Sequence, residues 1–283
     1  MRLNLLCLAT ITIACDPRVV ANTKIDGSTE ADGDADSDAD SDADSDADAD
    51  SDADTDPSAC ADGPSKTGPW WSTHPITAAG ATATNTPYSQ DAGLTAVRSA
   101  AVAATGGNEA INLPVQGAIV TAVGYVPAGG TYVSFWMADS SGPMFGYNVD
   151  LPSADTLQPG DVVTFLATEV VNYFDTPELT AVQNFTVTNT GAPVWVIDGM
   201  AEAPLTYASH GEAVVEVWGE LVGGPVDCGA DCYDFEYANN IITFRTSSTY
   251  DRVGDCIHYI GPLTQFGGVE QLDATNFNWY WSY

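Results

Sequence analysis

Basic residues are scarce in this chain. It has 283 residues, of which 7 are Lys or Arg and 39 are Asp or Glu, and its formal net charge is -32. From residue 111 to residue 283 the only basic side chains are Arg245 and Arg252, and the stretch 111–187 has none. A surface of this charge repels phosphate backbones and anionic headgroups, and it releases no counterions on contact with them. We therefore expect no nucleic-acid partner.

Catalytic signatures are also missing. The His residues are His74, His210 and His258, and there is no H-E-x-x-H zinc motif, no G-x-S-x-G nucleophile turn and no phosphate-binding Gly loop. His258 lies in an apolar stretch, which indicates a packed or strand-edge side chain. Carboxylate pairs such as Glu216 and Glu220 arise by chance in so acidic a chain. We expect no enzymatic activity, no cofactor and no metal site.

The apolar run at the N-terminus is too short to cross a membrane. Leu3–Ala14 has about twelve residues, whereas a helical span needs about 20. Its length suits the core of a signal peptide, which we assign to residues 1–14. The string T-I-A-C at Thr12–Cys15 resembles the lipobox of bacterial lipoproteins, which implies acylation of Cys15 and a lipid-anchored place in the cell envelope or on the cell surface. Cleavage after Ala21 is the alternative and gives a secreted protein.

Small and acidic residues dominate the segment 15–59. Residues 31–56 hold thirteen Asp in a near-continuous Ser-Asp-Ala-Asp pattern, with no Lys or Arg. Such a segment buries too little apolar surface to fold, and its like charges keep it extended, so we predict a disordered linker. The pattern D-x-D-x-D also begins the calcium loop of EF-hands, but the Glu at its twelfth position is missing. We expect a spacer with at most a weak calcium association.

Residues 60–110 form a lead-in segment rich in Ala, Thr, Gly and Pro. Trp70 and Trp71 are its apolar centre, either as a platform for a sugar or as a pair that packs the segment onto the next domain. The spacing of apolar residues in Asp91–Ala104 predicts a short helix. Its expected buried face consists of Leu94, Val97 and Ala101.

From residue 111 onward the pattern predicts an all-β fold, because apolar β-branched runs alternate with turn residues. We expect one barrel in residues 111–200 and a second in residues 201–283. The reason is an internal repeat, in which Gly160–Leu179 and Gly254–Leu272 share a Gly-Asp turn, an apolar strand and an aromatic loop. The first set of expected strands is Val115–Val126, Tyr132–Asp139, Pro143–Asp150, Asp161–Val170 and Leu179–Val187. The second set is Ala213–Leu221, Cys232–Tyr237, Ile241–Thr246, Asp255–Ile260 and Glu270–Trp281.

The expected strand Tyr132–Asp139 has two different faces. Alternation places Val133, Phe135 and Met137 on one side, and Tyr132, Ser134 and Trp136 on the other. Aromatic rings flanked by acids and amides suit a neutral sugar, since a ring face stacks on C–H groups without needing charge. The candidate ligand-binding residues are Tyr132, Trp136 and Tyr147. The alternative for Trp136 is that it packs under the lead-in segment with Trp70 and Trp71.

Several strings resemble the OB-like domains of bacterial extracellular proteins. Val115–Val123 (V-Q-G-A-I-V-T-A-V) and Tyr132–Asp139 (Y-V-S-F-W-M-A-D) are similar to their first two strands. Leu157–Val163 (L-Q-P-G-D-V-V) is similar to the start of their fourth strand, and Tyr207–Val217 (Y-A-S-H-G-E-A-V-V-E-V) to the opening of a second domain. The resemblance covers residues 94–283 and implies two tandem five-stranded OB-like Greek-key barrels.

The chain contains 6 Cys residues. Cys7 leaves with the signal peptide and Cys15 is assigned to lipidation. The remaining thiols are Cys60, Cys228, Cys232 and Cys256. Their even number in an oxidising compartment predicts two disulfides, and the alternative of zinc lacks a second close Cys pair or a nearby His. In an OB barrel the end of the first strand lies near the start of the fourth, so the resemblance implies that Cys256 pairs with Cys228 or Cys232, and Cys60 with the other.

These features together predict a non-catalytic envelope lipoprotein that displays two barrels to a polysaccharide or an envelope protein. Two alternatives remain open. One is nucleic-acid binding, a common use of the OB fold, although fold alone does not establish function. The other is a purely structural component of a surface assembly.

Overall fold

The computed structural model of the chain describes residues 60, 63–64, 66, 68–152, 154–275 and 277–283. The expected signal peptide, the lipidated Cys15 and the acidic linker lie outside these residues. Across the described residues, each helix is too short or too polar to cross a bilayer.

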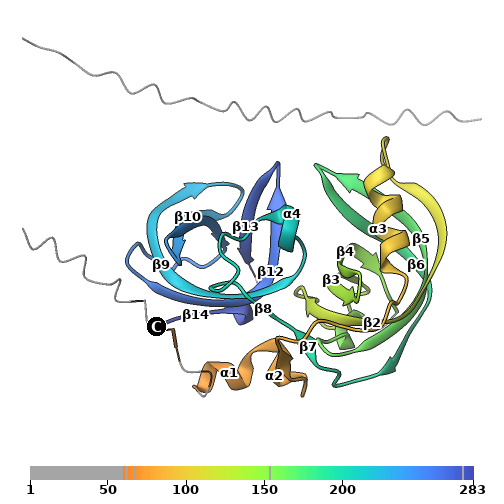
Figure 1. The fold of residues 1–283 in the computed structure, drawn as a ribbon, viewed down its shortest axis with the longest axis horizontal. Helices are drawn as coiled ribbons and strands as arrows, with labels where there is room; N and C mark the ends of the chain where they lie inside the picture. Colours follow the sequence, from red (N-terminus) through yellow and green to blue (C-terminus); the bar gives the residue numbers. More distant parts are fainter. Residues whose placement is uncertain (1–59, 61–62, 65, 67, 153, 276) are drawn as a thin grey trace, which may run out of the picture. The chain divides into compact units, whose positions relative to one another are not determined.

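The first barrel consists of five strands that close into a ring (Figure 1). They are β2 (Glu109–Val123), β3 (Tyr132–Asp139), β4 (Gly142–Asp150), β5 (Val162–Tyr173) and β6 (Thr176–Asn189). The order around the ring is β2-β3-β4-β6-β5, and every pair is antiparallel except β4–β6. A fifth strand inserted between the third and the fourth is the Greek-key arrangement of the OB fold.

The second barrel repeats this plan. Its strands are β9 (Val214–Asp227), β10 (Asp231–Tyr237), β11 (Asn240–Thr246), β12 (Cys256–Phe266) and β13 (Val269–Ala274). They follow one another as β9-β10-β11-β13-β12, and β12 pairs with β9 to close the ring. The short strands β8 (Ile197–Asp198) and β14 (Tyr280–Ser282) extend the sheet at β9 and β12. The predicted tandem OB-like architecture is confirmed.

The internal repeat is visible in the backbone hydrogen bonds. In each barrel the Gly-Asp turn before the fourth strand exchanges two bonds with one residue of the first strand. These bonds are Gly160 N to Val120 O (2.8 Å), Val120 N to Asp161 O (2.8 Å), Gly254 N to Leu221 O (2.8 Å) and Leu221 N to Asp255 O (3.0 Å). Both glycines have positive φ, 88° and 96°, a conformation that side chains with a Cβ disfavour. The same turn therefore closes both barrels.

Some strand limits differ from the prediction. The first strand of the second barrel continues beyond Leu221 to Asp227, where we expected a Gly-rich loop. The β10–β11 turn is Ala238-Asn239 rather than Asn239-Asn240, since Tyr237 pairs with Asn240. The last expected strand is interrupted after Ala274 by the 3₁₀ turn η2 (Phe277–Trp279).

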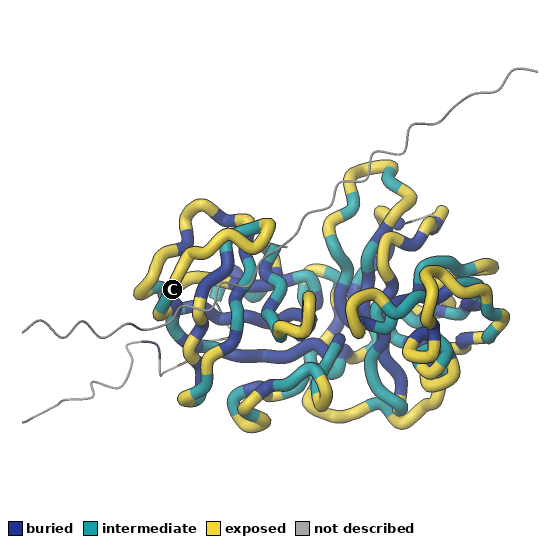
Figure 2. The backbone as a smooth tube through the Cα atoms, turned by 90° about the horizontal axis from the view of Figure 1, so that it is seen from above, coloured by how far each residue is buried: buried dark blue, intermediate teal, exposed yellow. Residues whose placement is uncertain are grey.

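The predicted helix is present as α3 (Leu94–Ala103), which lies against β5 and β6 (Figure 1). Its expected apolar face, Leu94, Val97 and Ala101, is completely buried. The helix covers one end of the first barrel, and its side chains belong to the same core cluster as Phe135 and Phe165. In Figure 2 many of the buried residues lie toward the interior, while the outermost loops are largely exposed.

The lead-in segment is fastened to the second barrel. It contains α1 (Pro69–Thr73), α2 (Pro75–Ala78) and β1 (Ala83–Thr84), and β1 pairs in parallel with β7 (Val194–Trp195) of the connection between the barrels. Trp70 is buried, with its ring centroid 4.8 Å from that of His258. Trp70 therefore packs the lead-in segment onto the second barrel. Because its ring is buried, it cannot serve as the sugar platform that was the other expectation.

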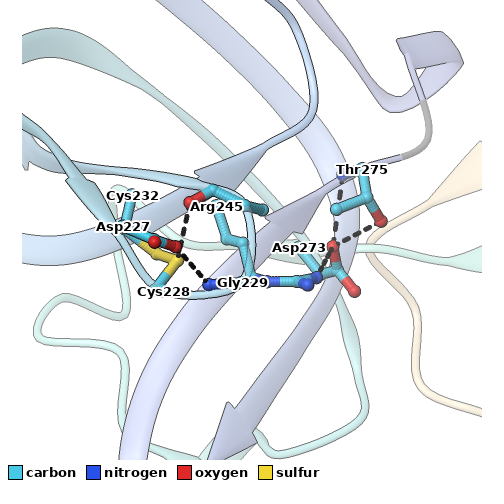
Figure 3. The surroundings of a disulfide bond; sticks show 8 residues. Asp227, Cys228, Gly229, Cys232, Arg245, Asp273 and Thr275 are labelled. Atoms are coloured by element: carbon cyan, nitrogen blue, oxygen red, sulfur yellow. Dashed lines mark hydrogen bonds and ion pairs between the residues drawn. A yellow bond between two sulfur atoms is a disulfide. The ribbon is translucent and has the colours of Figure 1, made fainter.

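The disulfide pairing differs from the prediction. Cys60 bonds to Cys256, and Cys228 bonds to Cys232 (Figure 3). The expected Cys256–Cys228 or Cys256–Cys232 bond was wrong because β9 is longer than expected. Cys256 pairs with Glu220, and Cys228 lies about eight residues further along, roughly 26 Å at about 3.3 Å per residue. The expectation that a cysteine staples the lead-in segment to the second barrel is confirmed.

Candidate ligand-binding face

The outer face of β3 and β4 in the first barrel is the surface that OB folds commonly use for oligonucleotides and oligosaccharides. Val133, Phe135 and Met137 point into the barrel core, as predicted. The outward set on β3 is Tyr132, Ser134 and Trp136, and the outward aromatic residues on β4 are Phe145 and Tyr147. A Cβ at Gly146, between the last two, would lie 3.0 Å from Phe135, which fixes the inward direction of that position.

One end of this face is covered by the second barrel. Trp136 is only 4% exposed, stacks on Phe145 at 4.7 Å and meets the ring of Trp279 edge-on at 5.2 Å. Its indole Nε1 donates a hydrogen bond to Glu212 Oε2 at 2.6 Å. Trp136 therefore offers no ring face to a ligand, a correction to its candidate role. It packs: its ring neighbours are Phe145 and Trp279, and it belongs to the same core cluster as Trp70, against which Trp71 also packs.

The other end of the face is open. Tyr132 is 57% exposed and Tyr147 is 53% exposed, and Tyr125 in the β2–β3 loop is 85% exposed. Tyr147 lies 6.1 Å from Phe145, so the buried Trp136–Phe145 stack continues into the exposed ring. We call Tyr125, Tyr132 and Tyr147 the tyrosine strip. Two of the three predicted ligand residues therefore remain accessible.

The two aromatic loops of the repeat meet in space. The β5–β6 turn of the first barrel and the β12–β13 turn of the second are joined by a hydrogen bond from Gln265 Nε2 to Asp175 O at 3.0 Å. The rings of Phe174 and Phe266 lie 5.9 Å apart, and both are more than half exposed. The exposed apolar side chains here are Tyr173, Phe174, Phe266 and Val269, which we call the tip patch. The repeat predicted both loops, but not their contact.

The junction between the barrels contains two buried carboxyl groups. Glu212 accepts hydrogen bonds from Trp136 Nε1 and, at 2.8 Å, from Tyr207 Oη at its other oxygen. Burial raises the pKa of Glu212 to about 7; the bonds from Tyr207 and Trp136 oppose this rise, while the charge of Glu178 adds to it. Burial also raises the pKa of Glu178 to about 7. We call Trp136, Glu178, Tyr207 and Glu212 the junction cluster.

Each basic side chain in the described part of the chain is occupied by protein groups. Lys66 forms an ion pair with Glu216 at 2.5 Å, and Arg245 pairs with Asp273 at 3.4 Å (Figure 3). Arg98 donates to the carbonyls of Ser141 and Pro143, and Arg252 donates to those of Thr249 and Asp251. Neither the tyrosine strip nor the tip patch includes a cation.

His74 and His258 are buried side chains. His258 Nε2 lies 2.9 Å from Glu216 Oε1 on the buried side of β12. Burial lowers the pKa of His74 to about 4, its Nε2 lies 2.9 Å from Ile260 O, and its Nδ1 accepts from Ile76 N. Within the described residues, no group of three His, Cys, Asp or Glu side chains is placed to hold a metal ion.

Sequence reasoning missed Phe145 and the junction cluster. Phe145 had a usable signal, because it lies two residues before Tyr147 and strand alternation places both on one face. Glu212 had none, because its partner Trp136 is 76 residues away in the chain. Only the docking of the two barrels brings these side chains together.

The strand orders define a tandem OB-fold protein. No protein-family model and no curated protein matches the chain. Among solved structures, it is similar to the tetrameric p202 HIN2 crystal structure, at 11% identity over 63% of this chain and 95% of that one, with a TM-score of 0.32. The p204 HINb domain matches at 10% identity over 63% and 100%, with a TM-score of 0.32. The Ifi202 HINa domain in complex with 20-bp double-stranded DNA matches at 12% identity over 62% and 98%, with a TM-score of 0.30. Similarity this low carries no argument about function, which rests on the residues themselves.

Proposed function

We propose that this chain is a non-catalytic binding module of the cell envelope, anchored by a lipid on Cys15, that holds a neutral polysaccharide on the tyrosine strip. The observation that carries the proposal is that the rings of Tyr132 and Tyr147 are exposed on the strand pair that OB folds use for ligands, with exposed Tyr125 in the β2–β3 loop. In the described part of the chain, the Lys and Arg side chains that could favour a phosphate are bound by other protein groups.

The chemistry of the strip suits an uncharged, ring-shaped ligand. A tyrosine presents a flat apolar face and a hydroxyl at its edge, so it can stack on sugar C–H groups and hydrogen-bond to a sugar hydroxyl. Asn148, beside Tyr147, is exposed, and its backbone N–H is already bonded to Ser134 Oγ at 3.1 Å, which fixes the strand there. The tip patch is a second exposed aromatic surface on the same chain.

The test is a glycan-panel binding measurement on the full mature chain with its disulfides intact. We expect Tyr132→Ala and Tyr147→Ala each to weaken binding to the glycans that the wild type holds by about tenfold, the equivalent of about 1.4 kcal/mol. Tyr250→Ala is the control, because Tyr250 is an exposed tyrosine that lies in the β11–β12 connection, away from β3 and β4 in the chain. Equal affinity in all three variants, or no binding to any glycan, contradicts the proposal.

Nucleic-acid binding is the competing use of the fold. Unspecific binding of single strands combines stacking rings with a positive groove. The rings are available, but the basic side chains of the described residues are engaged elsewhere. We therefore expect no measurable binding of single- or double-stranded DNA at low salt, and micromolar affinity would overturn the electrostatic argument.

A further inference from the structure

We infer that the junction cluster is a proton-operated latch: the two barrels are firmly docked while Glu178 or Glu212 carries a proton, and the docking loosens when both are ionised. The latch would regulate the tyrosine strip, and only that consequence rests on the proposed function. The latch itself stands on the geometry of the junction.

The first observation is the position of Glu212. Its carboxylate lies between the barrels and is buried, with one oxygen bound by Trp136 of β3 and the other by Tyr207 of α4 (Tyr207–His210). Its backbone has φ of 66°, a left-handed conformation that costs a non-glycine residue about 1 kcal/mol or more, and its N–H is held by Leu263 O at 2.7 Å. The fold thus holds a buried acidic residue in a left-handed backbone conformation between the two barrels.

The second observation concerns the hydrogen-bond donors and ionisable groups around Glu212. Both of its hydrogen-bond donors are neutral, and the charges that act on it come from further acids. The ionisable groups around it are Tyr207 of α4, Glu178 of β6, Asp273 of β13 and Tyr259 of β12. Glu270 accepts a hydrogen bond from Tyr207 N. The cation that interacts electrostatically with Tyr207 is Arg98, and its guanidinium is already bound to the carbonyls of Ser141 and Pro143.

The two carboxyl groups therefore titrate as a coupled pair. Two donors can support one ionised carboxylate on Glu212, but among the described residues no ion pair offsets a second negative charge on buried Glu178. The pKa of each is raised to about 7 in the folded protein, above the ordinary value of 4.5. A raised acid pKa means that the docked state binds more protons than the open state, so docking is strongest below about pH 5 and weakens as the pH rises through 7.

The junction is connected directly to the ligand face. Trp136, which donates to Glu212, stacks on Phe145, and Phe145 contacts Tyr147 of the tyrosine strip. If Glu212 loses its docked position, the outer end of this stack loses its support. Binding to the strip should then be weaker at alkaline pH than at mildly acidic pH.

The test is amide hydrogen exchange on the full oxidised chain from about pH 5 to pH 9, corrected for the intrinsic effect of pH. We expect exchange in segments 134–147 and 205–214 to increase at least about tenfold in a transition that begins near pH 5 and levels off above about pH 7, while segment 162–170 of the first barrel stays constant. The double variant Glu178→Gln/Glu212→Gln should lose the transition. Glu236→Gln, an exposed acid on β10, should keep it.

A third variant guards against a double variant that does not fold. Tyr207→Phe removes a hydrogen bond that favours ionised Glu212, so it should move the midpoint to higher pH, an effect that lost packing alone does not produce. Constant exchange in the wild type, an unchanged midpoint in Tyr207→Phe, or a transition that persists in the double variant overturns the latch. Exchange needs no ligand, so a glycan panel that stays silent while the midpoint is observed refutes the proposed function and leaves the latch intact.

Discussion

Asp139 is the last residue of β3, and its side chain also binds backbone groups at the start of helix α3. Its Oδ2 accepts hydrogen bonds from the backbone N–H groups of Ala92 and Leu94, at 2.9 and 3.1 Å. The residue at the N-terminal cap of α3 is Gly93, which has no side chain to serve that purpose. A carboxylate 45 residues away therefore caps the helix and ties it to the barrel.

We expect Asp139→Ala to lower the free energy of unfolding by about 1–2 kcal/mol, because the N–H of Leu94, the first residue of α3, and the N–H of Ala92, just before the helix, both lose their acceptor. Burial raises the pKa of Asp139, but hydrogen bonds from Ser141, Leu94 and Ala92 outweigh it, and the net pKa lies below the ordinary 3.8. The stabilisation is therefore present above about pH 4 and is lost as the pH falls through the lowered pKa. Urea unfolding at neutral and acid pH measures both effects.

The control for this prediction is Asp150→Ala, at an exposed residue at the end of β4. It should leave the urea midpoint nearly unchanged. If Asp139→Ala is as harmless as the control at neutral pH, the cap is not a source of stability.

For individual residues, the sequence predicted the direction in which a side chain points but not whether another part of the molecule covers it. Alternation along β3 correctly placed Tyr132 and Trp136 on the face opposite Val133. It could not distinguish exposed Tyr132 from buried Trp136, because the cover on Trp136 comes from Glu212 and Trp279 in the other barrel.

Among the elements, β9 makes the two strand pairings that close the second barrel. It pairs with β10 over its C-terminal half and with β12 over its N-terminal half, so it contacts both neighbours of the ring. Gly219 lies next to Glu220, the residue at which these two ladders overlap. A Cβ there would be 1.9 Å from Glu236 O, a backbone atom that cannot move without breaking the β9–β10 pairing.

Gly219→Ala should therefore destabilise the protein by at least about 1–3 kcal/mol, the usual cost of overpacking, since the obstacle is backbone rather than a flexible side chain. Gly106→Ala is the matched control, because nothing lies within 4 Å of the position where its Cβ would be. Thermal unfolding of the two variants should differ clearly. Equal melting temperatures would mean that β9 and β10 can separate at this point without loss.

Element type was predictable because apolar alternation and Gly-Asp turns are local signals. Strand ends were not, and β9 shows why. Gly223, Gly224 and Pro225 are typical of a loop, yet β9 continues through them to Asp227. Pairing with β10 and the Cys228–Cys232 bond hold this end in extended form. Tertiary pairing overrides local propensity here.

At the scale of the whole molecule, the two disulfides have different roles. Cys60–Cys256 spans 196 residues and fastens the lead-in segment to the start of β12, whereas Cys228–Cys232 spans 4 residues and closes one hairpin. In the loop-closure description, a cross-link stabilises the fold by restricting the unfolded chain, and it does so more for the longer loop.

The double variant Cys60→Ser/Cys256→Ser should lose roughly 5 kcal/mol of unfolding free energy, and Cys228→Ser/Cys232→Ser roughly 2 kcal/mol, in the loop-closure description. Guanidinium unfolding of both, next to the oxidised wild type, gives the comparison. A larger loss for the short loop would show that hairpin geometry, rather than chain entropy, sets the contribution of these bonds.

The sequence by itself determined the all-β class, the tandem repeat, the acidic charge, the use of all four described cysteines in disulfides and the buried face of α3. These depend on composition, on alternation and on short motifs, which act between residues close together in the chain. The tertiary structure alone decided the pairing of Cys60 with Cys256, the burial of Trp136, the contact of Phe174 with Phe266 and the pair of buried acids at the junction. Each of these joins residues that are far apart in sequence, and their meeting depends on strand length and on how one barrel docks against the other, which no local pattern records.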